Sequence, residues 1–190
     1  MQNNLFIFDF FGVICNEITA AWCKKHCTPE KTQDLKRNLF LRGDLGFLNI
    51  DEVIAELAKV SGQTTEEVEA ELFKTAKLNE KTLSLMQSLK EKHKVAVLSN
   101  APRGSIEKLI PLENLKNFCH EIVISAHIGM AKPDPKIYEY VINLFREKFD
   151  NIFMIDDTAA NLEPLEKMGI TGILFTTAEE VEKQIKNFLE

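Results

Sequence analysis

The sequence predicts a doubly wound α/β fold, in which helices cover both faces of a parallel sheet, with a helical cap inserted after the first strand. Residues 5–8, Leu-Phe-Ile-Phe, form a short apolar run bounded by polar residues, which suits a strand buried on both faces. Strand-like and helix-like segments alternate over residues 80–190, and this alternation favours right-handed crossovers and a parallel sheet. Residues 17–76, by contrast, show helical patterns and no strand signal. We therefore expect a core of residues 1–15 and 80–190 and a cap domain of residues 16–79.

The composition is that of an ordinary soluble globular protein of one domain with a small insertion. Of the 190 residues, 45% are hydrophobic and 27% are charged. The 29 acidic and 23 basic residues give a net charge of −6, which argues against a general nucleic-acid binder. No apolar run approaches the roughly 20 residues of a membrane span, and residues 1–4 lack the features of a signal peptide. We expect a cytoplasmic protein that binds neither nucleic acid nor membranes.

The four cysteines, Cys15, Cys23, Cys27 and Cys119, show no C-x-x-C spacing. His26 lies between two of them in sequence, so that group could approach a metal, but no matching second pair follows. Reduced, structural thiols are the expectation.

The predicted cap begins and ends its helices with well-defined signals. Thr28 before Pro29 indicates the start of one helix. Two capping boxes, Asn49 with Glu52 and Thr64 with Glu67, indicate the starts of two more. Gly62 is expected to end the second of these helices. Apolar residues recur at helical spacing behind each start, which indicates a compact helical insert.

The predicted core follows in order after residue 80. Helical spacing predicts helices around residues 85–89, 106–110, 134–144, 162–168 and 177–188. Apolar runs predict strands at residues 95–98, 122–124, 152–155 and 173–175. Asp134 before Pro135 indicates a helix start, and Gly169 a helix end.

Polar residues follow four of the predicted strands. The first strand is followed by Asp9, the second ends in Ser99 and Asn100, Lys132 comes shortly after the third, and the fourth ends in Asp156 and Asp157. Because the carboxyl ends of parallel strands meet at one edge of the sheet, we expect these side chains to converge there. Each segment alone is also typical of a turn, a loop or a helix start; their occurrence together in this order favours a site.

The chemistry of these residues is coherent. Asp9, Asp156 and Asp157 would repel one another unless a hard cation such as Mg²⁺ lies among them. Lys132 and the Ser99 hydroxyl can hold phosphoryl oxygens, and Lys132 offsets negative charge on the nucleophile. An aspartate between a metal and a phosphate is a competent nucleophile.

This constellation resembles the haloacid dehalogenase (HAD) superfamily over nearly the whole chain. The motifs are Asp-Phe-Phe-Gly-Val from residue 9, Leu-Ser-Asn from 98, Lys-Pro-Asp-Pro from 132, and Ile-Asp-Asp from 155 with Asn161. The resemblance implies a Rossmann-like core, and the position of the insert is similar to the branch with a helical-bundle cap. It further implies that Asp9 is the nucleophile and that Lys132 is a second catalytic residue. By the same resemblance, the substrate ligands are Ser99, Asn100 and Lys132. The implied Mg²⁺ ligands are Asp9, the Phe11 carbonyl, Asp156 and Asp157.

One position departs from the family pattern. Phosphatases of the family usually carry a second aspartate two residues after the nucleophile as general acid and base, and here that residue is Phe11. A phenyl ring cannot transfer a proton, and such transfer typically contributes about 10²–10⁴-fold. The position is usually aromatic in the dehalogenases, but those enzymes need no metal, and the Asp156–Asp157 pair is similar to the metal-using branch.

The resemblance therefore predicts a HAD-like hydrolase, namely a Mg²⁺-dependent phosphatase acting on a small phosphorylated metabolite through an aspartyl-phosphate, with Phe11 expected to weaken its catalysis. Two alternatives stay open: a dehalogenase-like or phosphonatase-like hydrolase, and a catalytically impaired member that binds a phosphorylated ligand. The cap should close over the site and choose the substrate. Candidates for that surface are Arg42-Gly43-Asp44, Trp22 and His26, although solvated charge and cap core are the favoured explanation for each of them.

Overall fold

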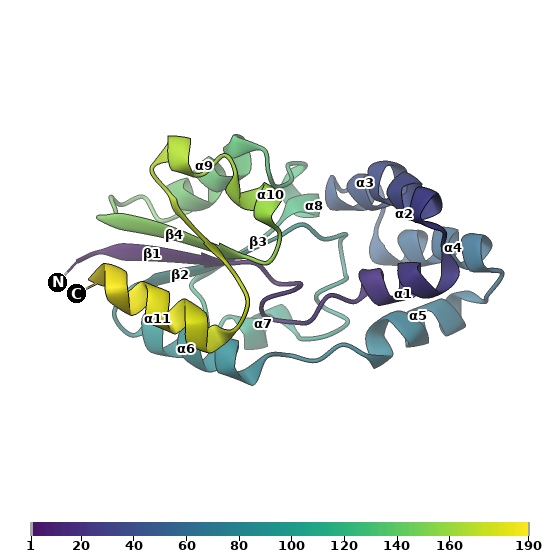
Figure 1. Cartoon of the computed structure of the whole chain (residues 1–190), viewed down its shortest axis with the longest axis horizontal. Coiled ribbons are helices and arrows are strands. Elements are labelled where there is room, and N and C mark those ends of the chain that lie inside the picture. Colours follow the sequence, from purple (N-terminus) through teal and green to yellow (C-terminus); the bar gives the residue numbers. More distant parts are fainter. Residues whose placement is uncertain (1, 190) are drawn as a thin grey trace.

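The computed structural model describes residues 2–189 and shows a five-stranded sheet in which every strand is parallel to its neighbours. The strand order is β3-β2-β1-β4-β5. The strands are β1 (Asn4–Phe8), β2 (Lys94–Ser99), β3 (Glu121–Ile124), β4 (Asn151–Asp156) and β5 (Thr171–Leu174). The chain leaves the central strand β1, crosses to one side of it for β2 and β3, and to the other for β4 and β5 (Figure 1). This order confirms the predicted doubly wound α/β fold.

The central strand β1 is apolar because both of its faces are covered. Leu5 and Ile7 contribute to one buried cluster and Phe6 and Phe8 to another, and all four are fully buried. Since successive side chains of a strand point to opposite faces, these residues divide between the two layers of helices. The first cluster includes residues of α9 (Pro135–Leu144), and the second includes residues of α6 (Glu80–Lys90) and α11 (Ala178–Leu189).

The helices of residues 19–74 pack around a third buried cluster of their own, at the right of the molecule in Figure 1. They are α1 (Thr19–His26), α2 (Pro29–Leu35), the π-helical segment η1 (Lys36–Phe40), α3 (Leu41–Asp44), α4 (Ile50–Ser61) and α5 (Thr65–Lys74). The side chain of Thr28 caps α2, and both predicted capping boxes are present. Gly62 ends α4 in the left-handed conformation. We refer to these helices as the cap; its assignment as a separate domain stays a prediction.

The contacts that tie the cap to the core include two sets of hydrogen bonds to the backbone. The two connecting segments run side by side: Asn16 N donates to Lys77 O at 3.2 Å, and Asn79 N donates to Ile14 O at 2.7 Å. On the other side, the loop after β2 supplies Arg103. Its guanidinium donates to Gly46 O at 2.8 Å, and its carbonyl accepts from Ile50 N at 3.0 Å. The cap is therefore held against the carboxyl edge of the sheet.

Two predicted helices of the core are wrong in form. Residues 106–110 make successive turns, because Gly104 has a φ of +85° and Pro111 disfavours helical geometry at the residue before it. Residues 162–168 are divided between α10 (Ala159–Leu162) and the 3₁₀ segment η2 (Glu166–Met168), since Pro164 interrupts the helix. The short helices α7 (Leu112–Leu115) and α8 (Ser125–Ile128) lie where no helix was predicted.

In the part of the chain that the structure describes, no helix combines the length and the apolar character needed to cross a membrane.

Candidate active site

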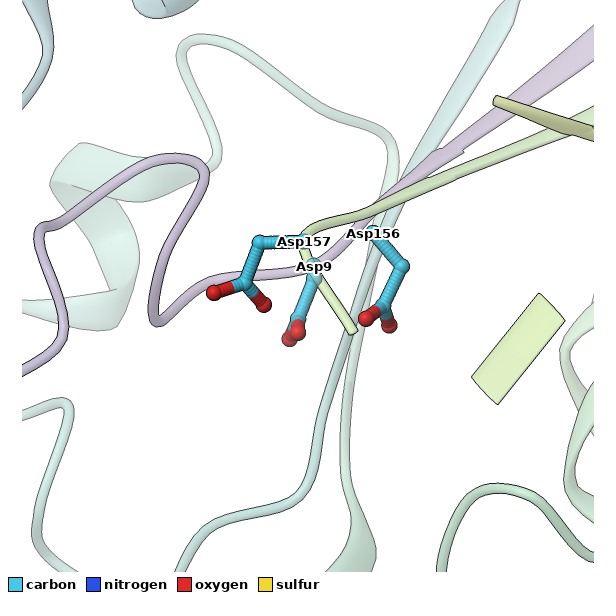
Figure 2. Close-up of side chains that lie close together, drawn as sticks. All are labelled: Asp9, Asp156 and Asp157. Carbon is cyan, nitrogen blue, oxygen red and sulfur yellow. The ribbon is translucent and has the colours of Figure 1, made fainter. Parts of the chain in front are cut away.

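Asp9, which follows β1, lies at the carboxyl edge of the sheet together with Asp156 and Asp157, at the end of β4. Figure 2 shows the side chains of Asp9, Asp156 and Asp157 gathered where these two strands end. Each offers one carboxylate oxygen, and these oxygens lie within 4.8 Å of one another. Because β1 and β4 are direct neighbours and Phe8 lies opposite Ile155, the next residues, Asp9 and Asp156, emerge side by side.

Lys132 lies in the middle of this group. Its Nζ atom is 2.8 Å from Asp9 Oδ1 and 2.6 Å from Asp156 Oδ2, and it also donates to Leu98 O at 3.1 Å. The backbone of Lys132 is fixed by Asn100, whose amide donates to Lys132 O at 2.9 Å and accepts from Lys132 N at 2.8 Å. The ends of β2 and β4 therefore position this lysine beside Asp9.

The electrostatics of the pair follow from burial. Burial raises the pKa of the Asp9 carboxyl, with Lys132 opposing and Asp156 adding to the shift. Burial by itself would lower the pKa of Lys132, but the carboxylates of Asp9 and Asp156 raise it above its ordinary value. Burial and the nearby Asp156 also raise the pKa of Asp157. Three acids share one ammonium, so the cluster favours a further cation or bound protons.

The two aspartates at the end of β4 have different surroundings. Asp156 is fully buried, and its oxygens accept from Lys132 Nζ, from Thr158 N at 2.9 Å, and from Asn161 Nδ2 at 2.9 and 3.1 Å. The side chain of Asp157 is exposed and accepts one long hydrogen bond, from Thr158 Oγ1 at 3.3 Å. Among the described residues, Asp157 thus has fewer hydrogen-bond partners than Asp156.

Two supporting residues escaped the sequence reasoning. The Tyr138 hydroxyl, on α9, donates to Asn161 O at 2.6 Å and so supports the residue that holds Asp156. Ser125 Oγ accepts from Ala101 N at 3.0 Å and fixes the turn after β2. Neither has a local sequence signal, because a tyrosine on a helix face and a serine after a strand are both common without such roles.

Gly12 allows the chain to approach Asp157 closely. Its φ is +87°, and a Cβ atom built on it would lie 2.1 Å from Asp157 Oδ2. Only glycine leaves room for that carboxylate and adopts this conformation without strain. The turn after β1 is therefore shaped around Asp157.

Ser99 is fully buried, and its hydroxyl has no hydrogen-bond partner among the described residues. A buried hydroxyl without a partner costs about 1–3 kcal/mol. The neighbouring Asn100 lines the cavity described next, whereas Ser99 does not.

A cavity of about 300 Å³ lies between the carboxyl edge of the sheet and the cap. Its polar wall includes Asp9, Asn100, Lys132 and Asp157 from the sheet side. The walls from the cap side are mainly apolar and include Phe40, Ile50, Val53, Leu57 and Leu72. The cap thus covers the residues that follow the strands.

The predicted cap candidates divide sharply. Asp44 lines the cavity, whereas Arg42 is exposed and points to no described partner. Trp22 is 2% exposed and belongs to the cap core. His26 Nε2 lies 2.9 Å from Glu71 Oε2, and its ring packs on Trp22 with 4.8 Å between the centroids. Trp22 and His26 are therefore structural, in agreement with the explanation favoured from the sequence, and neither is among the residues that line the cavity.

The acidic cluster could hold a divalent metal ion. Carboxylate oxygens are the ligands that Mg²⁺ prefers, and Mg²⁺ sites commonly use one or two protein carboxylates with water and substrate phosphate. Asp9 and Asp157 have oxygens at the cavity, and Phe11 lines it as well. Asp156 is occupied by hydrogen bonds and serves to orient Lys132 and Asn161.

Comparison with known proteins gives one family. A family model described as hydrolase, haloacid dehalogenase-like hydrolase, matches residues 4–169. The drimenol cyclase drtB of Aspergillus calidoustus is 27% identical over 193 residues, which cover 95% of this chain and 35% of that protein. The bifunctional epoxide hydrolase 2 of Sus scrofa is 30% identical over 118 residues, covering 56% of this chain and 21% of that protein. The chain thus spans about a third of the cyclase and about a fifth of the epoxide hydrolase in these matches.

Solved structures share the fold over nearly the full chain. A HAD-like family hydrolase from Porphyromonas gingivalis has a TM-score of 0.78 at 21% identity, covering 100% of this chain and 99% of that one. A HAD family enzyme from Bacteroides thetaiotaomicron, in complex with magnesium and inorganic phosphate, has a TM-score of 0.73 at 23% identity, covering 93% and 95%. A dehalogenase has a TM-score of 0.64 at 15% identity, covering 90% and 84%.

Proposed function

Because the chain belongs to the haloacid dehalogenase-like hydrolases, we propose that it is a Mg²⁺-dependent phosphatase that acts on a small phosphorylated metabolite through an aspartyl-phosphate intermediate. The observation that carries this proposal is the group formed by Asp9, Lys132 and the Asp156–Asp157 pair at the floor of a covered cavity. It offers a nucleophile, a buried cation and free carboxylate oxygens within a few ångströms of one another.

The roles follow from the contacts. Asp9 is the nucleophile, since its carboxylate borders the cavity and pairs with Lys132 at 2.8 Å. Lys132 attracts the phosphoryl group and offsets charge as it develops. The Ser99 hydroxyl and the Asn100 amide stay proposed phosphoryl ligands; Asn100 lines the cavity, whereas Ser99 lies behind its lining with a hydroxyl that has no partner among the described residues.

Asp9, Asp157 and the Phe11 carbonyl are the proposed Mg²⁺ ligands, with Asp156 as their support. When bound, the ion would neutralise charge on the phosphoryl oxygens and on Asp9. The magnesium and phosphate found in the Bacteroides enzyme, which shares the fold, agree with this assignment.

The acidic cluster and the pairing of Asp9 with Lys132 also favour the phosphatase over a dehalogenase-like hydrolase and over a member that only binds its ligand. A hydrolase that needs no metal would have no use for carboxylate oxygens within 4.8 Å of one another at its nucleophile. A member that only binds a phosphorylated ligand needs no nucleophile beside the lysine. The phosphatase uses every member of the group.

Phosphate release from a panel of phosphorylated metabolites, with and without Mg²⁺, tests the proposal. Asp9→Asn is the matched control, because it keeps the size of the side chain and removes its charge. We expect release that requires Mg²⁺ and is reduced at least about 10³-fold by Asp9→Asn, as expected for loss of a nucleophile. Release that is equal without Mg²⁺, or that survives Asp9→Asn, would contradict it.

A further inference from the structure

Phe11 leaves the proposed phosphatase without a carboxyl group two residues after its nucleophile, although the cavity contains another candidate. Hydrolysis of a phosphate ester needs a proton for the leaving oxygen and then a base to activate water. Phe11 borders the cavity and supplies neither. The missing group must come from another wall.

The geometry of the reaction indicates which wall of the cavity supplies the missing acid and base. The attacking and leaving oxygens lie roughly in line through phosphorus, so attack by Asp9 directs the leaving oxygen away from the sheet and toward the cap. Of the described residues that line the cavity from α1–α5 and η1, Asp44 is the one with an acidic side chain; the others are threonine, phenylalanine, isoleucine, valine and leucine. Resting on the proposed phosphatase function, we infer that Asp44 is the catalytic acid and base of this site.

Asp44 is held in place from both sides. Gly43 lies against the core loop, where a Cβ atom on it would be 2.8 Å from Pro102 Cγ. On the other side, Gly46 O accepts the 2.8 Å hydrogen bond from Arg103, and a Cβ atom on Gly46 would lie 2.3 Å from Ala126 O. The cap segment is therefore fixed to the core within two residues of Asp44, as a catalytic group requires.

The surroundings of Asp44 suit proton transfer. Burial raises the pKa of Asp44 to about 7, with the positive charge of Lys132 opposing the rise and the negative charge of Glu17 adding to it. A carboxyl group with a pKa near the working pH can both give and accept a proton.

Other charged groups lie on the elements around Asp44. The charged residues that line the cavity with it are Asp9, Glu17, Lys132 and Asp157. The elements packed against α3 carry Lys36 and Arg37, on η1, and His127, on α8. Glu17 is the competing acid, but it is exposed, and its Oε1 accepts from both the amide and the hydroxyl of Thr19 at 2.7 Å.

The two proton transfers balance. In the first step Asp9 forms a bond to phosphorus, the bond from phosphorus to the leaving oxygen breaks, and that oxygen takes the proton of Asp44 to leave as an alcohol. In the second step the Asp44 carboxylate takes a proton from water, whose oxygen bonds to phosphorus as the bond to Asp9 breaks. Inorganic phosphate leaves, and Asp9 and Asp44 regain their starting states.

Asp44→Asn tests this role with two substrates of different leaving groups, in the presence of Mg²⁺. Phenyl phosphate needs a proton on its leaving oxygen, whereas 2,4-dinitrophenyl phosphate does not. We expect kcat/KM to fall about 10²-fold or more for phenyl phosphate and less than about three-fold for the dinitrophenyl ester. The variant should also release one equivalent of dinitrophenolate per chain in a burst, because without a base to activate water the aspartyl-phosphate is hydrolysed slowly and accumulates.

The unmodified protein gives an independent test that needs no variant. Its kcat/KM for phenyl phosphate should fall as the pH rises through about 7, while kcat/KM for the dinitrophenyl ester should lack this limb. Equal losses for both esters in Asp44→Asn, or loss of the limb in Glu17→Gln and not in Asp44→Asn, would overturn the assignment. An unmodified protein that hydrolyses neither ester would overturn the proposed function and the inference with it; hydrolysis of both esters with an unaffected Asp44→Asn variant would overturn the inference alone.

Discussion

Asp44 is a carboxyl group that folding places in an environment that disfavours its charge. Its pKa is about 7 in the folded protein, against an ordinary value of 3.8 that applies to the unfolded chain. Between these two values the folded protein binds a proton that the unfolded chain releases, so this group makes stability fall as the pH rises from about 4 to about 7. Such an arrangement is typical of functional sites, where stability is lost in favour of chemistry.

Removing that ionisable group should therefore stabilise the protein at high pH. As the pH rises from 5 to 8, we expect the unfolding free energy of Asp44→Asn to increase by on the order of 2 kcal/mol relative to that of the unmodified protein. This corresponds to about 5 °C in melting temperature. Thermal unfolding of both proteins across this range, without Mg²⁺, measures it. A difference in melting temperature that stays flat with pH would mean that Asp44 titrates normally.

Phe11 allows the acid to be moved back toward the nucleophile. The ring lines the cavity and packs edge-on against Phe10 at 5.0 Å, so a smaller carboxylate has room at this position. In the Asp44→Asn background, Phe11→Asp should restore hydrolysis of phenyl phosphate by about ten-fold or more. Phe11→Asn in the same background is the control, because it has the same size and no acid; recovery of activity in that variant would show that the gain is steric.

Single residues also show how far sequence reasoning reaches. Asp9, Lys132 and Asp156 could be found because each directly follows, or lies shortly after, an apolar run, and in a parallel sheet these positions meet. Asp44 was only one of several cap candidates, since its distance from Lys132 depends on how the cap folds back. Trp22 and His26 had equal standing and proved to be part of the cap interior.

At the scale of elements, the turn after β1 forms part of the proposed metal site through Gly12. Alanine at this position would place its Cβ atom 2.1 Å from Asp157 Oδ2 and must displace that carboxylate. We expect Gly12→Ala to lose most of the rise in melting temperature that Mg²⁺ produces in the unmodified protein, as Asp157→Ala should.

Gly62 provides the matched control for this turn. Its φ is +72°, close to the +87° of Gly12, but nothing lies within 4 Å of a Cβ atom built on it. Gly62→Ala should cost about 1–2 kcal/mol of unfolding free energy from backbone strain and keep the full Mg²⁺ response. If both alanine variants respond equally to Mg²⁺, Gly12 does not shape the metal site.

Elements were predictable where local signals and packing agree. The capping boxes of α4 and α5 and the apolar strands are present as expected. The segment of residues 106–110 has the apolar spacing of a helix, but Pro111 and the positive φ of Gly104 prevent a regular helix there. Likewise, the apolar spacing through Leu162, Leu165 and Met168 conceals the break at Pro164. Periodicity alone does not register such interruptions.

At the scale of the whole molecule, the sheet supplies the proposed nucleophile and metal ligands, while the cap supplies the inferred acid and an apolar wall. The cavity closes only where these two parts meet, and Arg103 joins them. Which metabolite fits cannot be read from local sequence, since its binding surface is assembled from separate helices of the cap. The domain boundaries and the cytoplasmic location stay predictions.

Trapping of the covalent intermediate tests the central claim most directly. The protein is quenched with acid during turnover of 2,4-dinitrophenyl phosphate, and its mass and phosphorylated peptide are determined. The account predicts one phosphoryl group per chain, on Asp9, formed only with Mg²⁺ and accumulating further in Asp44→Asn. Turnover without a phosphorylated Asp9 in either protein, or a phosphoryl group on another residue, would contradict it.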